Sequence, residues 1–431
     1  MNPATDDVFG QPQTLRADVE VIGLVGVAHG ASHFYQLALP PLFPFLRDEF
    51  GLSWTMLGAI TTVFFIVSGV GQALAGFVVD RFGARRTLMV GMCSMSGGAA
   101  VAAFATGYEA LLVSAMLIGL GNCVMHPADY AVLNSKISPR RIGHAFSVHG
   151  LSGNLGYAAG PAVLYPLALL YGWRVAMGSA AVIGLIVLGI ILFRPRSFEV
   201  LGRSDAGSTA SASAAPAASG RTVPSVPSAE QAGGSMMGLP SWVSPSVILC
   251  FLFFVAVTLA STGLQNFAPQ ALRVIYGISA STATGALTLY LIAGACGMFA
   301  GGFAAAASNR HERIAMVCLI GCSLLLFGLA SGIAPPFMIL PVLALAGFFL
   351  GILQPSRDML VRKAAPVRAS GRVFGLVYSG IDVGGAIGPA VLGSLLDHQH
   401  PGAAIAVAAT AVMAGVAVAA AIAQSLARKA G

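Results

Sequence analysis

Hydrophobic residues form long runs along this chain, separated by short polar segments. Each run provides at least about the 20 residues that a helix needs to cross the hydrocarbon core of a bilayer. We therefore predict an all-α membrane protein with twelve transmembrane helices. The expected helices cover residues 21–46, 54–79, 87–107, 110–135, 145–170, 173–193, 244–272, 281–307, 313–333, 337–361, 371–396 and 402–426.

One interval between the apolar runs is much longer than the others. Residues 194–243 are rich in Ser, Ala, Pro and Gly, and their middle carries almost no large apolar side chains. Such a composition cannot bury a core and is typical of a flexible linker. We expect residues 1–193 and 244–431 to form an N-terminal and a C-terminal six-helix bundle on either side of it.

The two halves of the chain are similar in sequence. Residues 126–164 align without a gap to residues 354–392, and eleven of the 39 paired positions are identical, including a GPAVL block. An apolar chain built from two related halves is the arrangement that a rocking transporter uses, with its site between two pseudo-symmetric bundles.

Composition agrees with a membrane protein. Charged residues make up 9% of the chain and apolar residues 56%, with a mean hydropathy of +0.82, whereas soluble domains carry about 25% charged residues. The net charge of +7 does not indicate a nucleic-acid partner, because the basic residues lie in short loops. The six cysteines all fall within apolar runs, so we expect no metal site.

Basic residues are concentrated in alternate loops, which predicts the orientation. By the positive-inside rule, the loops that carry them are cytoplasmic. Both termini and the linker are then cytoplasmic, in a multi-pass protein of a bacterial-type inner membrane. The basic loops contain Arg81, Arg85, Arg86, Lys136, Arg140, Arg141, Arg194, Arg196, Arg203, Arg310, Arg313, Arg362, Lys363, Arg368 and Arg372.

The loop after the second expected helix reads GFVVDRFGARRT. Its glycine can let two helices approach, and its acid and arginines can form a charge-assisted network at the helix ends. Such a network can hold one conformation and release another, while a simple stop-transfer cluster is the alternative. The residues concerned are Gly76, Asp80, Arg81, Gly83, Arg85 and Arg86.

This string, the twelve expected helices and the central linker together resemble the major facilitator superfamily over nearly the whole chain. The second-half counterpart departs from the pattern, with Asn309-Arg310 in place of Asp-Arg. The block around His126-Pro127, with FSVHGLSGNLGYAAGP, is similar to the fosmidomycin-resistance branch of the drug-efflux members. The resemblance implies alternating access by rocking of the two bundles, and a central cavity lined by the first, fourth, seventh and tenth helices.

A G-x-x-x-G-P sequence occurs once in each half, in the fifth and eleventh expected helices. It resembles the core of the superfamily's antiporter motif, but it is equally the small-residue face that two helices need to pack closely. Both interpretations stay open. The residues are Gly156, Gly160 and Pro161, and Gly384, Gly388 and Pro389.

Polar residues inside the expected helices are the best site candidates, because a charge in hydrocarbon costs several kcal/mol unless it is paired or faces water. His29 and His33 lie one turn apart, and His126 and Asp129 share a second helix face. The remaining cavity candidates are Tyr35, Gln36, His149, Asn154, Gln265, Asn266, Arg357, Asp358 and Asp382.

The internal repeat pairs Asp129 with Arg357, and we expect the two to face each other across the cavity. Asp129 is then the leading candidate for the proton-coupling acid, and a static ion pair is the alternative. His29 and His33, which titrate near neutral pH, can share the proton or bind substrate. We expect Asp358 to pair with Arg362, four residues on, and Asp382 to contribute to helix packing.

The predicted function is proton-coupled efflux of a small organic compound or drug. The alternative is proton-coupled uptake of a small carboxylate or other organic anion, with Arg357 as the anion anchor. The partners are then a small-molecule substrate, protons and the lipid bilayer, acting on a monomer. The chain shows no nucleotide-binding motif and no sign of a cofactor. A membrane sensor would not need the titratable groups, and an embedded enzyme would need a paired catalytic set that the sequence does not show.

Overall fold

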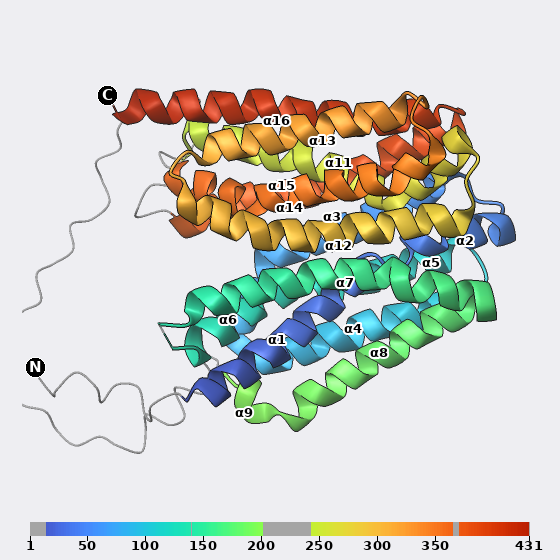
Figure 1. Cartoon of the computed structure of the whole chain (residues 1–431). Coiled ribbons are helices and arrows are strands. Elements are labelled where there is room, and N and C mark those ends of the chain that lie inside the picture. The colour runs from blue at the N-terminus through green and yellow to red at the C-terminus, as the bar shows by residue number, and fades with distance from the viewer. Residues whose placement is uncertain (1–13, 139, 201–242, 365–369, 431) are drawn as a thin grey trace, which may run out of the picture.

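The computed structural model describes residues 14–138, 140–200, 243–364 and 370–430, and this part of the chain is almost entirely helical. Long helices run side by side in two bundles (Figure 1). The first half contains α1 (Leu15–Gln36), η2 (Pro40–Leu42), α2 (Phe43–Phe50), α3 (Trp54–Phe82), α4 (Ala84–Ala103), α5 (Tyr108–Asn122), α6 (Met125–Lys136), α7 (Ile142–Tyr171), α8 (Trp173–Phe193) and α9 (Pro195–Phe198). The second half contains α11 (Pro245–Tyr276), α12 (Ala280–Ala307), α13 (His311–Ala330), η4 (Pro336–Met338), α14 (Ile339–Ala364), α15 (Ser370–Asp397) and α16 (Pro401–Ala430). In Figure 1 the second-half helices lie above and most first-half helices below, while α3 of the first half lies beside α12 and α14 of the second.

The predicted all-α membrane fold is confirmed. Nine helical stretches of the described residues are long and apolar enough to cross a membrane, with α5 and α6 acting as one stretch. The other three expected ranges are occupied by α1, α4 and α7, so for these three the count of twelve stays a prediction. Large apolar side chains on the outer faces are exposed, among them Phe77 and Phe193, as expected for surfaces that meet lipid.

Two expected helices are interrupted, and proline accounts for both breaks. The helix expected at 21–46 ends at Gln36 and continues as η2 and α2, because Pro40, Pro41 and Pro44 cannot donate backbone hydrogen bonds. The helix expected at 110–135 breaks at Cys123 and Val124. Pro127 cannot bond to the carbonyl group of Cys123, four residues earlier, and its ring clashes with that group.

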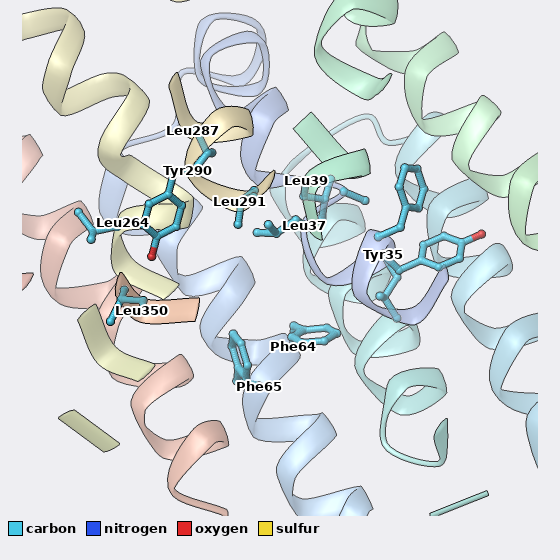
Figure 2. Packing of buried hydrophobic residues seen from close by; sticks show 14 of the residues in the cluster. Tyr35, Leu37, Leu39, Phe64, Phe65, Leu264, Leu287, Tyr290, Leu291 and Leu350 are labelled. Atoms are coloured by element: carbon cyan, nitrogen blue, oxygen red, sulfur yellow. The ribbon is translucent and has the colours of Figure 1, made fainter. Parts of the chain in front are cut away.

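Helix packing repeats between the two bundles. In the first bundle α1 packs on α7, α3 on α5 and α4 on α8; in the second α11 packs on α15, α12 on α14 and α13 on α16. The two most extensive contacts between the bundles join α3 with α15 and α7 with α12. Apolar side chains of both bundles belong to one buried cluster, and Figure 2 shows Leu37 of the first bundle beside Leu291 of the second.

The expected linker is only partly described. Residues 201–242 lie outside the described residues, so the domain boundaries stay a prediction. At its start, residues 195–198 form α9, and the Phe198 side chain is fully buried against the first bundle. The first residues after α8 are thus packed onto the first bundle.

Candidate functional site: a buried aspartate and four histidines

Asp129 lies at the centre of a buried polar cluster in the first bundle. Its side chain is fully buried, and its Oδ2 atom lies 3.2 Å from Nε2 of His149 and 3.3 Å from Nδ1 of His29. The contact with His149 has hydrogen-bond geometry, whereas Nδ1 of His29 is close but not aligned for a hydrogen bond. The Oδ1 atom of Asp129 is buried without a hydrogen-bond partner.

The four histidine rings are in contact with one another. His29 stacks on His149 with ring centroids 3.5 Å apart, and its ring lies 4.5 Å from that of His33 and 5.0 Å from that of His126. Both ring nitrogens of His33 and Nδ1 of His126 are buried without a hydrogen-bond partner. One carboxylate and four imidazoles thus form a single cluster, contributed by α1, α6 and α7.

The local sequence explains why these side chains meet. His29 and His33 lie one turn apart on α1 and face α7 at Gly153, where an added Cβ would lie 2.9 Å from Nε2 of His29. A larger residue would therefore displace the rings. On the other side, the break before Pro127 separates α6 from α5, so that His126 and Asp129 lie on the first turns of a separate helix.

Within the part of the chain that the structure describes, the ion-pair partners of Asp129 are both histidines. A carboxylate held only by imidazoles can share a proton with them, because each imidazole can act as a donor or an acceptor. The donor atoms of His29, His33 and His126, and those of His29, Asp129 and His149, lie within 4.8 Å of one another. That spacing would also admit a metal ion, although we assign none here.

A second charged site lies on α14. Nε of Arg357 lies 3.1 Å from Oδ1 of Asp358, and its guanidinium group stacks over the ring of Phe254 at 4.2 Å. The expected pair between Asp129 and Arg357 is not formed in this conformation. Asp129 faces the histidines of α1 and α7, while Arg357 is held by its sequence neighbour. Asp358 pairs with Arg357 instead of the expected Arg362.

Tyr130 lies between the two charged sites. Its ring centroid is 5.1 Å from that of His149 and 5.5 Å from that of Phe146, and it is within electrostatic range of Asp358 and Arg357. The sequence interpretation did not select Tyr130. The repeat could have indicated it, since it aligns Tyr130 with Asp358.

Two of the other cavity candidates hold the packed structure together. The hydroxyl group of Tyr35 donates to the backbone oxygen of Ala180 at 2.7 Å and the ring is buried. Asn266 accepts a hydrogen bond from Thr61 at 2.7 Å, which links α11 to α3 across the bundles. Gln265 is half-buried on the same helix.

Gln36 and Asn154 both interact with side chains of other helices. Gln36 lines a cavity of about 20 Å³, which has room for about one water molecule. Asn154 donates to Sδ of Met298 on α12 at 3.0 Å, so it lies where α7 of the first bundle meets α12 of the second.

The GFVVDRFGARRT string spans the end of α3 and the start of α4. Nothing lies within 4 Å of a Cβ added at Gly76, so the expected close helix approach is absent there. Gly83 adopts a φ of 84° between α3 and α4, a conformation that favours glycine. Nη2 of Arg85 donates to the backbone oxygen of Leu192 at the end of α8, at 2.8 Å. Asp80, Arg81 and Arg86 are exposed.

The repeated glycines pack helices within each bundle. A Cβ added at Gly160 would lie 2.9 Å from the backbone oxygen of Leu37, next to α1. A Cβ added at Gly384 would lie 2.5 Å from the backbone oxygen of Val255 on α11. Gly156 and Gly388 meet the backbones of α1 and α11 in the same way. Pro161 is buried in α7, and the backbone oxygen of Pro389 lies against Gly58 of α3.

An internally duplicated, multi-pass helical bundle with polar residues in its membrane part defines an integral membrane protein of the transporter type. The model of the Major Facilitator Superfamily matches residues 25–389 and 249–430. The chain therefore belongs to this superfamily of transporters and is not an enzyme.

Known proteins of two transport classes are similar to the chain. The fosmidomycin resistance protein of Escherichia coli is 26% identical over 402 residues, which cover 89% of this chain and 88% of that protein. The hexuronate transporter of Bacillus subtilis is 25% identical, with 88% and 89% covered. A crystal structure of the peptide transporter POT in complex with sulfate has a TM-score of 0.71 at 14% identity, covering 98% of this chain and 96% of that one.

Proposed function

We propose that this transporter exports a small organic compound or drug in exchange for protons, by alternating access, as a monomer in a bacterial-type inner membrane with both termini cytoplasmic. The observation that carries the proposal is the fully buried carboxyl group of Asp129, whose ion-pair partners among the described residues are His29 and His149. A charge at such a depth is costly, so intramembrane acids of this kind usually serve proton or ion movement.

The cluster gives the proton a defined place in the cycle. With a proton bound to Asp129, the carboxyl group and the neutral histidines carry no net charge, so the bundles can close around them. Without it, the carboxylate favours a conformation that admits water. His33 and His126, whose buried nitrogens lack hydrogen-bond partners, can accept the proton from Asp129 or contact a polar substrate.

The efflux direction is supported by the fosmidomycin resistance protein among the relatives. The glycine motif of α7 packs α1 and α7 together and therefore does not by itself support antiport.

The uptake alternative is favoured by a specific observation. The guanidinium group of Arg357 stacks on Phe254, and its side chain keeps 15% of its surface exposed, so it can bind a carboxylate. A hexuronate transporter is also among the relatives. In this alternative Arg357 is the anion anchor and the same Asp129 cluster carries the proton.

The test uses the intact protein in a host stripped of its major efflux pumps. Growth is measured against a panel of antibiotics that includes fosmidomycin and, in parallel, on single small carboxylates as carbon source. Export predicts raised resistance that a protonophore abolishes. New growth on a carboxylate, with no added resistance, would establish uptake instead.

The role of Asp129 is tested in proteoliposomes with the compound that the growth panel identifies. Asp129→Asn is expected to abolish transport driven by a pH gradient and to leave substrate exchange in place. Asp48→Asn, which changes an exposed acid of α2, is the control for loss of a carboxylate elsewhere. Transport is expected to be unaffected by EDTA, since the cluster is proposed to bind a proton. Unchanged proton-driven transport in Asp129→Asn would remove Asp129 from this role.

A further inference from the structure

Asp382 is an acid at the contact between the two bundles. It lies near the middle of α15 and packs directly on Gly69 of α3, where an added Cβ would lie 2.7 Å from the Cβ atom of Asp382. The side chain is half-buried, and the ion pairs found among the described residues do not include it. A carboxyl group is therefore placed between two helices that must move against each other in a rocking cycle.

The first half has a neutral residue at the equivalent place. The internal repeat aligns Asp382 with Asn154 of α7. Nδ2 of Asn154 donates to Sδ of Met298 at 3.0 Å and to the backbone oxygen of Gly150 at 3.1 Å. The repeat spacing also relates Gly69 to Gly297, the residue before Met298. The contact between α3 and α15 is therefore equivalent to that between α7 and α12. The first carries an acid, Asp382, where the second carries an amide, Asn154.

Polar side chains connect the Asp129 cluster to Asp382. Nδ1 of His29 lies 3.3 Å from Asp129, the rings of His29 and His33 are 4.5 Å apart, and that of Tyr157 follows at 4.4 Å from His33. The hydroxyl group of Tyr157 hydrogen-bonds with the side chain of Gln36, and Asp382 lies within its electrostatic range. His33 lies in the middle of this series of side chains. Both of its ring nitrogens are buried without a hydrogen-bond partner and so are available to accept and pass on a proton.

The groups that face Asp382 do not compensate its charge. Among the described residues, Tyr157 of α7 and Cys123, between α5 and α6, interact electrostatically with Asp382, and both are neutral acids under ordinary conditions. Gly69 and the apolar residues around it on α3 offer no cation. A carboxylate here costs several kcal/mol unless water reaches it, and binding of a proton removes that cost.

We propose that Asp382 is a second proton-binding carboxyl group of the transport cycle, supplied from Asp129 through His29, His33 and Tyr157. The inference rests on the proposed function and deepens it. In the transfer, protonated Asp129 gives its proton to the imidazoles, Tyr157 donates its hydroxyl proton to the carboxylate of Asp382, and Tyr157 regains a proton from His33. One proton moves in total, Asp129 becomes a carboxylate, Asp382 becomes a neutral acid, and the tyrosine is unchanged.

Protonation then controls the contact between α3 and α15. Neutral Asp382 can remain packed on Gly69, whereas the carboxylate favours separation of the helices and entry of water. The contact between α7 and α12 carries the uncharged Asn154 instead, so the separation of these two helices does not depend on protonation. Because only the contact between α3 and α15 carries an acid, the rocking motion would depend on whether Asp382 is protonated.

A first experiment requires no transported compound. The protein in proteoliposomes at pH 7 is treated with dicyclohexylcarbodiimide, which reacts with protonated carboxyl groups in apolar surroundings, and modified peptides are located by mass spectrometry. Modification of Asp382 is expected in the wild type, and the corresponding peptide of Asp382→Asn is expected to remain unmodified. Absence of modification at Asp382 between pH 6 and pH 8 would overturn the inference.

A second experiment measures proton-driven transport and substrate exchange with the compound that the growth panel identifies. Asp382→Asn installs the residue that the first half already has, so we expect the variant to fold, to lose proton-driven transport because the proton can no longer pass from Asp129 to Asp382, and to keep exchange. Tyr157→Phe, which keeps the ring and removes the hydroxyl group, is expected to slow proton-driven transport and to spare exchange. Asn154→Gln, a neutral change at the equivalent crossing, is the control.

The outcomes separate the inference from the proposed function. Wild-type proton-driven rates in Asp382→Asn or in Tyr157→Phe would overturn the role of Asp382 and its path. Loss of proton coupling in Asp129→Asn alone would leave the proposed function in place. If Asp129→Asn retains proton coupling, the role of Asp129 in the proposed function is overturned, whatever Asp382→Asn shows.

Discussion

Asp397, at the end of α15, accepts hydrogen bonds from Thr55, at the start of α3. The backbone nitrogen of Thr55 lies 2.8 Å from Oδ2 of Asp397, and the Thr55 hydroxyl group lies 2.6 Å from the same atom. The other carboxylate oxygen accepts from the backbone of Trp54 at 2.8 Å. An acid of the second bundle thus caps a helix of the first, where the unpaired N–H groups and the helix dipole favour a negative charge.

This cap should stabilise the closed contact at that end of the bundles. Asp397→Ala is expected to lower the free energy of unfolding by about 0.5–2 kcal/mol, the usual range for loss of a helix cap. Thermal unfolding of the purified protein in detergent measures the change. Asp397→Asn, which keeps the shape but loses the charge, should show a smaller effect. Equal stability of the wild type and Asp397→Ala would mean that the cap is not formed in the folded protein.

The close contact of α7 and α1 at Gly156 predicts a steric effect. Gly156→Ala places a Cβ against the backbone of Gly30 and should destabilise the protein by about 1–3 kcal/mol, the cost of overpacking. Gly143→Ala in the same helix is the matched control, since nothing lies within 4 Å of its added Cβ. Thermal unfolding compares the two. If the G-x-x-x-G-P sequence of α7 serves helix packing, Gly143→Ala must be more stable than Gly156→Ala.

Arg357 is expected to discriminate substrates by charge. Arg357→Ala should raise the apparent Kd for anionic substrates by about tenfold or more, since a hydrogen bond to a charged group contributes about 1.5–3 kcal/mol. Neutral substrates should change much less. Arg357→Lys keeps the charge but loses the planar stacking on Phe254, so an intermediate effect is expected. Competition binding measures all three proteins, and equal losses for both substrate classes would make Arg357 structural.

Glu49 predicts a pH-dependent contribution to stability outside the membrane-spanning segments. The indole N–H of Trp173 and the guanidinium group of Arg174 hold the pKa of the Glu49 carboxyl below its usual value of 4.5. The carboxylate therefore stabilises the contact of α2 with α8 above the ordinary pKa, and this contribution is lost as the pH falls through the lower, folded-state pKa.

Glu49→Gln, which removes the charge at every pH, measures this contribution. The difference in unfolding temperature between the wild type and Glu49→Gln should be present at pH 7 and should decrease as the pH falls below about 4, toward the folded-state pKa. Glu109→Gln, which changes an acid in the first turn of α5, serves as the control. A difference between wild type and Glu49→Gln that is independent of pH would show that the ion pair does not contribute.

The fold was largely predictable because membrane-spanning helices leave a strong signal in a single sequence. Apolar runs identified the helices, and the repeat from His126 to Leu164 revealed the duplication before any packing was known. The breaks at Gln36 and at Cys123 were not predicted. Each depends on a backbone hydrogen bond that a proline several residues later fails to make, which a hydropathy pattern does not register.

The site was only partly predictable for a different reason. Periodicity placed His29 with His33 and His126 with Asp129 on single helix faces, and the structure brings these four residues together. Sequence could not show that the partner of Asp129 would be His149 of α7 instead of Arg357 of α14. That choice depends on how the helices are rotated in the bundle, which side-chain spacing along one helix does not determine.

The polar residues of α1 and α7 also bear on how the protein is made. These two helices supply His29, His33 and His149, and together with α4 they fall outside the stretches that are apolar enough to cross a membrane by composition. A segment enters the bilayer from the translocation channel according to its own apolarity. We therefore expect α1 to insert more readily when a later helix shelters its histidines. The cluster that would carry protons in the finished transporter would then make membrane insertion of the first bundle a cooperative event.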